Sequence, residues 1–331
     1  MTGGKKWSKS SKTAAKAFHG KIKIVRQQPV VPVGTRLLAG DVVRIFLPAP
    51  GHGHAAPVVG ELVRKVLASV TRAGASPSLV VLPSGTGRLR ENPFALTGVR
   101  YPDRKLVEDA VDAWVASFRK AAGRVLPPVV LGIDCDTVSE PDGQAREYGG
   151  AIQLAVTIPS DVGAEVTITW KSLPTPGERP GLVTLWGDPS TKPPAVALDD
   201  NRPIASLGGR RALTLVCHDA TAFSGRATYA ANPGTWSGEI QRQYDLLCNV
   251  DPRGFSMAIH LIHCLPRRRR LDRMTSPVFQ NAHNVLTGNN YDVPVVAVAG
   301  LNPSCPVRAF RTLHTQLACS FRHVDVMVRV R

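Results

Sequence analysis

Apolar strand-like segments alternate with amphipathic helix-like segments along most of this chain, and this order is what most constrains its fold. The strand-like segments are short and continuously apolar, as in residues 79–83, which is typical of a sheet covered on both faces. The alternation stops once, where strands at 150–158 and 165–170 are joined by a turn too short for a helix, which predicts a hairpin. Helix–strand alternation with one hairpin indicates a single layered α/β domain.

The apolar periodicities also give the bounds of the expected elements. Apolar residues recur at helical spacing over 58–70 and 106–118. The other expected helices lie near 238–249, 277–287 and 307–319, and the other strands at 42–47, 128–133, 212–217, 256–265, 293–299 and 324–330. Residues 1–36 are rich in lysine and then in proline and valine, so we expect a basic arm without structure that leads into an edge strand or linker. The folded domain is expected over 37–331.

Composition limits the class of protein. With 331 residues, of which 43% are hydrophobic, the chain can bury a large core. No window approaches about 18 uninterrupted apolar residues, so we expect no membrane span. The six cysteines are scattered without close pairing, which suits free thiols in a reducing compartment better than a disulfide framework. Because the first residues also contain no apolar stretch of the signal-peptide type, we expect a cytoplasmic protein.

The chain is strongly basic, with a formal net charge of +16. The first 40 residues contain no acidic residue. A second basic region, the arginine cluster, consists of Arg267, Arg268, Arg269, Arg270 and Arg273. Such clusters attract phosphates by releasing counterions, so nucleic acid or another polyanion is one expected partner. The alternative is that the basic arm and the arginine cluster are solvated segments that keep the protein soluble.

Cys217 ends the apolar run 212–217 and is followed at once by His218 and Asp219. Many folds present a nucleophile in this way, on a thiol lifted to the tip of a buried strand where the chain turns. The turn exposes the sulfur, and the backbone N–H groups beyond it point toward a developing oxyanion. The alternative interpretation is a buried cysteine that packs as a small hydrophobic residue.

Two further strand ends carry polar residues in a recognisable order. One is Leu-Val-Val-Leu-Pro-Ser at 79–84, and the other is a strand followed by Lys171 and, seven residues later, by Glu178. Together with the strand that ends at Cys217, they resemble the nitrilase superfamily of carbon–nitrogen hydrolases. The segment 171–190, with its Leu-Pro-Thr, Glu-Arg and Trp-Gly-Asp elements, looks particularly like the stretch around the lysine of true nitrilases.

The resemblance covers about residues 40–310 and is specific around Lys171 and Cys217. It implies a single domain with a four-layer αββα sandwich, often paired into a homodimer or higher homo-oligomer, and no cofactor or metal. It further implies that Cys217 attacks a small amide or nitrile to give a thioester and that Lys171 steadies the oxyanion. Glu178 matches a second glutamate that helps to hold the lysine and the substrate.

The sequence departs from the family's pattern at Ser84, where the resemblance calls for a carboxylate as general base. A hydroxyl cannot accept a thiol proton near neutral pH, and losing a positioned base typically costs about 10²–10⁴ in rate. Three side chains offer a replacement: Glu178, which we favour, Glu91 and His218. Two hypotheses stay open. One is a hydrolase with altered or impaired chemistry, and the other is an inactive pseudoenzyme that uses the fold as a binding scaffold, with the basic arm and the arginine cluster contacting a polyanion.

Other polar residues near strand ends carry weaker signals. His260 and His263 lie three residues apart on an expected strand, which puts them on opposite faces and favours a structural role over a metal pair. Asp134 and Asp136 end a strand, where they either line a pocket or cap a turn. The loop Gly-His-Gly-His at 51–54 contains no carboxylate, so the sequence predicts no metal site there.

Overall fold

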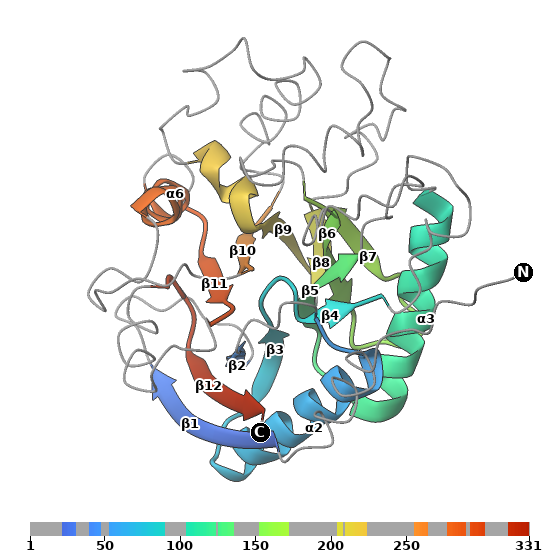
Figure 1. The fold of residues 1–331 in the computed structure, drawn as a ribbon. Coiled ribbons are helices and arrows are strands. Elements are labelled where there is room, and N and C mark those ends of the chain that lie inside the picture. The colour runs from blue at the N-terminus through green and yellow to red at the C-terminus, as the bar shows by residue number, and fades with distance from the viewer. Residues whose placement is uncertain are drawn as a thin grey trace, which may run out of the picture.

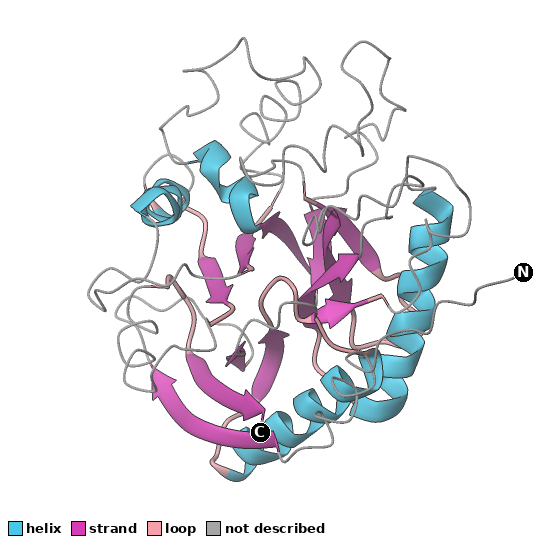
Figure 2. Cartoon of the chain, viewed as in Figure 1, coloured by secondary structure: helices cyan, strands magenta, loops and turns pink. Residues whose placement is uncertain are grey.

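The computed structural model describes residues 22–30, 40–47, 53–89, 104–123, 125–135, 152–171, 204–207, 209–223, 255–263, 277–288, 292–301 and 317–330. These residues form two β-sheets that face each other, with helices on both outer sides (Figures 1 and 2).

The larger sheet has eight strands, which are β1 (Ile22–Val30), β2 (Asp41–Phe46), β3 (Pro77–Val81), β4 (Gly87–Arg88), β5 (Val129–Cys135), β6 (Ile152–Ile158), β7 (Thr167–Trp170) and β12 (His323–Val330). Their order is β1-β12-β2-β3-β5-β6-β7, and β4 pairs with β5 outside this path. Strands β12, β2, β3 and β5 run parallel to one another. Because β6 is antiparallel to both β5 and β7, strands β5 and β7 point the same way.

The smaller sheet has four strands, which are β8 (Ile204–Leu207), β9 (Arg210–Val216), β10 (Met257–Ile262) and β11 (Val295–Ala299). Strands β9, β10 and β11 are parallel, and β8 pairs antiparallel with β9. Every residue of β10 and β11 is buried, which explains why these segments are almost continuously apolar instead of alternating.

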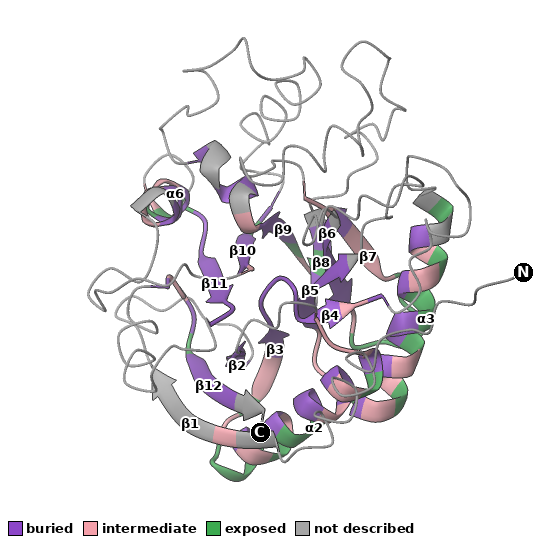
Figure 3. Ribbon diagram, in the orientation of Figure 1, coloured by how far each residue is buried: buried purple, intermediate pink, exposed green. Residues whose placement is uncertain are grey.

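Helices α2 (Ala56–Arg72) and α3 (Arg104–Ala122) cover the outer face of the larger sheet. Their apolar stripes join one core cluster with sheet residues such as Val43 and Val80, while their exposed residues face outward (Figure 3). The two helices approach closely at Gly60, because a Cβ there would lie only 2.5 Å from the carbonyl oxygen of Phe118.

Helix α6 (Pro277–Thr287) and the 3₁₀ helix η2 (Cys217–Phe223) cover the outer face of the smaller sheet. Phe279 and Leu286 of α6 and Phe223 of η2 pack against it in a second core cluster. The layers are therefore helices, larger sheet, smaller sheet and helices, which confirms the predicted four-layer α/β architecture.

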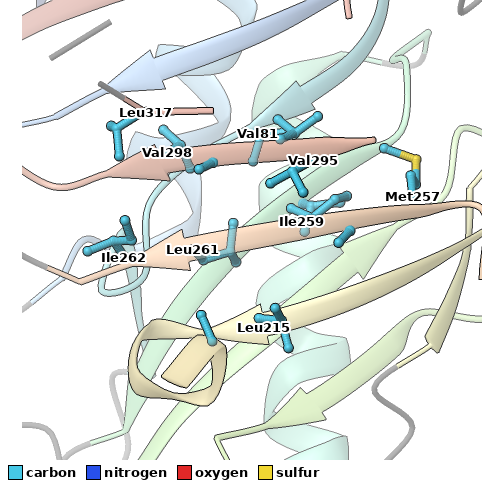
Figure 4. Close-up of a cluster of buried hydrophobic side chains, with 14 of the residues drawn as sticks. Val81, Leu215, Met257, Ile259, Leu261, Ile262, Val295, Val298 and Leu317 are labelled. Atoms are coloured by element: carbon cyan, nitrogen blue, oxygen red, sulfur yellow. The ribbon is translucent and has the colours of Figure 1, made fainter. Parts of the chain in front are cut away.

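The space between the sheets is filled by apolar side chains from both inner faces. The larger sheet contributes residues such as Phe46, Val81 and Val130. Figure 4 shows part of the cluster, with Ile259 and Leu261 of β10 and Val81 of β3 among the labelled residues. Burial of these apolar side chains supplies most of the free energy that holds the two sheets together.

A buried ion pair lies in this largely apolar layer. Arg44, on β2, is fully buried and makes two hydrogen bonds of 2.7 Å to the carboxylate of Asp325 on β12. Its Nη1 also donates to the carbonyl oxygens of Ala297 (2.9 Å) and Leu317 (2.9 Å), so the side chain ties β2 to β11 in the other sheet. Burial alone would lower the pKa of Arg44, but the charge and hydrogen bonds of Asp325 raise it above its ordinary value.

Most predicted elements are confirmed where the structure describes the chain, including the hairpin, which is formed by β6 and β7. Residues 22–30 were assigned to the basic arm, but they form β1 and pair with β12, so they belong to the larger sheet. The rest of the arm and the helix predicted near 238–249 lie outside the described residues.

The helix predicted over 307–319 is wrong at its end, and residues 302–316 lie outside the described part. Cys319 forms a β-bridge with Val296, and the N–H of Ala297 donates to the carbonyl oxygen of Ala318 at 2.8 Å. The segment thus runs along the open edge of β11. Pairing with that edge satisfies backbone groups of a buried strand, which outweighs the helical pattern of the local sequence.

Candidate functional site

The carboxyl ends of β3, β5 and β7 meet at one edge of the larger sheet. Asp134 on β5 lies opposite Gln153 on β6, and the N–H of Lys171, just beyond β7, donates to the carbonyl oxygen of Gln153 at 2.9 Å. These residues follow the two-residue side-chain period of Val130 and Ala155, which face the smaller sheet. They therefore form a polar row that faces the space between the sheets.

The carboxyl ends of β9 and β10 lie at the same end of the sandwich. His263, one residue beyond β10, fixes this arrangement, because its Nε2 lies 2.8 Å from Oδ2 of Asp134. Cys217 stands just beyond β9, and the register of the two strands places Val216 opposite Leu261. We call this end of the sandwich the polar edge and define it by Ser84, Asp134, Lys171, Cys217 and His263.

Cys217 has a φ of +48°, and Asp292 is the other non-glycine residue with positive φ in the described part of the chain. This left-handed conformation is strained for a residue with a side chain, and such strain gathers at functional turns. Here it marks the abrupt passage from β9 into η2, which the buried carboxylate of Asp219 supports by accepting a hydrogen bond from the N–H of Val216 (3.2 Å). Cys217 thus lies at a strand-to-turn junction, as the sequence predicts, and its role as a nucleophile stays a prediction.

A pair of buried histidines holds the backbone of Cys217 from behind. His260 Nε2 lies 2.7 Å from the carbonyl oxygen of Cys217, and His260 Nδ1 lies 2.9 Å from Nε2 of His283 on α6. A carbonyl can only accept, so Nε2 of His260 carries the proton and Nδ1 accepts from His283. Burial, together with the charge of Arg44, lowers the pKa of His283 to about 4, so this ring is neutral at neutral pH. His260 and His263 lie on opposite faces of β10, as predicted.

Ser84 lies beyond β3, where the chain crosses the inner face of β5. A Cβ on Gly132 would come within 2.2 Å of the Cα of Ser84, so only glycine at that position allows the crossing. A Cβ on the next residue, Gly85, would lie 2.6 Å from Nε2 of His263 and 3.0 Å from Oδ2 of Asp134. The position at which the resemblance calls for a carboxylate is therefore next to the Asp134–His263 pair.

Four buried side-chain atoms have no hydrogen-bond partner among the described residues, and two of them lie at the polar edge. These are Oγ of Ser84, a residue that is 3% exposed, and Oδ1 of Asp134, a residue that is 7% exposed. Leaving a buried polar atom unpaired costs about 1–3 kcal/mol, so native proteins contain few of them. Two such oxygens in one cluster are typical of a site that a ligand completes.

Several predicted site residues lie outside the described part of the chain. They are Glu91, Asp136, Glu178, Arg267, Arg268, Arg269, Arg270 and Arg273. Of the predicted set, the structure brings Ser84, Lys171 and Cys217 to one edge. It adds Asp134, which the sequence leaves open between lining a pocket and capping a turn, and His263, for which the sequence favours a structural role. Their one common signal in the sequence is that each ends or follows an apolar strand.

The residues that the structure describes contain neither a candidate metal site nor a candidate membrane-spanning helix. No group of three or more His, Cys, Asp or Glu side chains within them is placed to hold a metal ion. Nor does any helix in these ranges have both the length and the apolarity to cross a bilayer.

No family model and no curated protein matches the sequence. Among solved structures, the chain is similar to an amidase from Nesterenkonia sp., with a TM-score of 0.39 and 14% identity over 82% of this chain and 78% of the amidase. It is also similar to a carbon–nitrogen hydrolase from Helicobacter pylori G27, with a TM-score of 0.39 and 11% identity over 84% of this chain and 79% of the hydrolase. A third similar structure is a Saccharomyces cerevisiae member of branch 10 of the nitrilase superfamily. Its TM-score is 0.34, with 9% identity over 77% of this chain and 74% of that protein. With TM-scores below 0.5 and identities this low, the likeness establishes neither a family nor an activity for this chain.

Proposed function

We propose that this chain is a carbon–nitrogen hydrolase of the nitrilase type, which acts on a small amide or nitrile through a thioester on Cys217. The observation that carries the proposal is the left-handed turn at Cys217, at the end of β9 and on the same edge as Lys171. A nucleophile on a strained strand-to-helix turn is lifted clear of the sheet, and the N–H groups of the turn are available to an oxyanion.

Lys171 supports the proposal because its side chain is held toward the inner face of the larger sheet. Its ammonium group donates to Oε1 of Gln153 at 2.8 Å, and Gln153 is itself buried. A cation fixed in this way stabilises negative charge without reorganising during the reaction. From the resemblance, Glu178 assists by holding the lysine and the substrate.

The proposed reaction of an amide has two halves. In the first, the thiol of Cys217 gives its proton to a base, and the sulfur bonds to the amide carbon, while Lys171 and backbone N–H groups stabilise the oxyanion. The proton then passes to the nitrogen, the C–N bond breaks and the amine leaves. In the second half, water attacks the thioester, the acid is released and the thiol is restored.

Alkylation of Cys217 with iodoacetamide and a panel of small amides and nitriles test the proposal. We expect Cys217 to be labelled rapidly at neutral pH, in contrast to Cys319, whose thiol pKa is raised to about 11, chiefly by burial. Cys217→Ala abolishes turnover, whereas the matched control Cys319→Ala retains it. The proposal is contradicted if Cys217 reacts no faster than an ordinary thiol and every compound of the panel is left intact.

A second proposal is that the fold is a binding scaffold for nucleic acid or another polyanion. It is favoured by Ser84, which stands where a catalytic carboxylate is expected, and by the net charge of +16. Because β1 belongs to the larger sheet, the test removes residues 1–21 only, and a separate variant replaces the arginine cluster by glutamine. Salt-sensitive retention on heparin or DNA that is lost in these variants supports the scaffold. Retention by the intact protein that salt does not change contradicts it.

A further inference from the structure

We propose that His263, positioned by Asp134, is the general base and acid of this reaction. The inference rests on the proposed function, because it needs Cys217 as the nucleophile. It gives His263 the task for which the sequence offered Glu178, Glu91 or His218.

The contact between Asp134 and His263 joins the two sheets at the polar edge. Oδ2 of Asp134, on the larger sheet, lies 2.8 Å from Nε2 of His263, on the smaller one. The histidine side chain is 29% exposed, whereas the carboxylate side chain is only 10% exposed. A covered carboxylate beside a more accessible imidazole holds the ring in one tautomer and orientation and stabilises the imidazolium that forms during proton transfer.

The register of β9 and β10 brings His263 next to Cys217. Because Val216 lies opposite Leu261, the residue level with Cys217 is Ile262, and His263 is one position further along. Cys217 and His263 therefore leave two neighbouring parallel strands at the same end, and the turn at Cys217 frees its thiol from the side-chain alternation of β9.

The sequence change at Ser84 fits the presence of this pair. The backbone of Ser84 and Gly85 passes directly over Gly132 and against the histidine ring, so the space beside Asp134 is narrow. A glutamate at position 84 would set a second negative charge next to the Asp134–His263 pair. Serine avoids this repulsion, and its buried Oγ, which has no partner among the described residues, has the capacity to bind a polar group of a ligand.

The proton path balances without any reactant besides water. Nε2 of His263 makes the contact with Asp134, so Nδ1 takes the thiol proton as sulfur bonds to the amide carbon. The imidazolium then gives this proton to the nitrogen as the C–N bond breaks. In the second half, Nδ1 takes a proton from water as its oxygen attacks the thioester and returns it to the departing sulfur of Cys217.

The test compares two substitutions in the full chain, His263→Gln and Asp134→Asn. In the wild type we expect iodoacetamide labelling of Cys217 to stay fast well below pH 8.5, where an ordinary thiol titrates. In His263→Gln, labelling follows an ordinary thiol, and turnover falls about 10²–10⁴-fold. Asp134→Asn changes both in the same direction, because the amide no longer selects the tautomer. The other described charged or titratable side chains near this edge include those of Lys171, Asp219 and His260. Arg88, which pairs with Asp134 in the sheet, and His54, which forms a β-bridge with Gly87, are also close to it.

The outcomes separate the inference from the proposed function. If the wild type is labelled rapidly and turns over a substrate, and His263→Gln does both equally well, His263 is not the base and the proposed function stands. If wild-type Cys217 behaves as an ordinary thiol and nothing is turned over, the proposed function fails and the inference fails with it.

A variant that loses its fold is recognised by its thermal unfolding curve. In that case the His263→Gln variant is replaced by His263→Ala, which is assayed with imidazole added to the buffer. A small base that enters the vacated space restores part of the turnover only if the substitution removed proton transfer. Absence of this rescue, together with wild-type rates in Asp134→Asn, overturns the inference.

Discussion

Two clusters of buried polar side chains join the two sheets, and they differ in how completely their atoms are paired. Arg44 forks onto Asp325, and its remaining nitrogen reaches backbone carbonyl groups such as that of Ala297. At the polar edge, Oγ of Ser84 and Oδ1 of Asp134 have no partner in the described part of the chain. In a low dielectric, a satisfied cluster rigidifies the fold, whereas unpaired atoms cost free energy and keep capacity for a ligand. We therefore expect the Arg44 cluster to stabilise the fold and the polar edge to bind a ligand.

The largest effect is expected from breaking the paired cluster. Arg44→Met leaves the carboxylate of Asp325 buried without its counter-charge, which lowers the free energy of unfolding by about 3–5 kcal/mol. Denaturant unfolding measures this loss. The double variant Arg44→Met, Asp325→Leu recovers part of it, because no buried charge remains. A loss below about 1 kcal/mol in the single variant shows that the ion pair does not hold the sheets as described.

At the polar edge, the corresponding change affects turnover more than stability. Lys171→Met removes the proposed oxyanion partner and lowers kcat by about 10²–10³-fold, while unfolding changes little because the side chain is only half-buried. The matched control is Lys65→Met, because Lys65 is an exposed lysine on α2, the helix that covers the outer face of the larger sheet. Equal turnover in the Lys171 and Lys65 variants contradicts the role of Lys171.

The histidines behind Cys217 predict a pH dependence of stability. The pKa of His283 is lowered to about 4 in the folded protein, mainly by burial, whereas an unfolded histidine titrates near 6.5. The unfolded chain therefore binds more protons between these values, so this group's contribution is complete above pH 6.5. It is lost as the pH falls toward 4, by about 3 kcal/mol.

Comparison with His283→Gln isolates this contribution, because glutamine can still donate to His260. His54, whose pKa burial also lowers to about 4, is present in both proteins and cancels from the difference. Unfolding free energies measured from pH 7 to 4 should fall less steeply in the variant. Identical slopes in the two proteins contradict a neutral His283 in the folded protein.

The smallest effect is expected at Ser84. Its Oγ has no partner among the described residues, so Ser84→Ala loses no hydrogen bond of the fold and removes an unpaired buried hydroxyl, which raises the free energy of unfolding by about 1 kcal/mol. Thr86→Val is the matched control, since it removes a hydrogen bond of 2.6 Å to the carbonyl oxygen of Pro83 and costs about 1 kcal/mol. If Ser84 contacts the substrate, Ser84→Ala raises KM. A large loss of stability without any change in KM assigns it to the fold instead.

The sequence predicted those parts of the fold that follow from local periodicity. Helices α2 and α3 and the buried strands show it clearly, because one element's own residues define its apolar face. The sequence offers β1 only as an edge strand or linker at the end of the arm, and it does not predict β8. β1 contains charged residues and Pro29, which an edge strand tolerates, and β8 has only four residues. The β-bridge at Cys319 depends on a neighbouring strand and has no local signal.

The candidate site divides in the same way. The sequence predicts Lys171 and Cys217 as site residues because each stands in a local motif at the end of a strand. Asp134 and His263 are 129 residues apart, and only the packing of the two sheets brings them together. A register shift of one residue in either strand would turn one of these side chains to the opposite face, and the sequence of a single strand does not fix that register.

The central claim is that Cys217 forms a thioester with the substrate, and acyl-enzyme trapping tests it most directly. Wild-type protein is mixed with an amide that it turns over, quenched in acid during turnover and digested for mass spectrometry. We expect the peptide containing Cys217 to gain the mass of the acyl group, hydroxylamine to remove it, and Cys217→Ala to show no such adduct. Turnover with an unmodified Cys217, or with the acyl group on another residue, contradicts a thioester on Cys217.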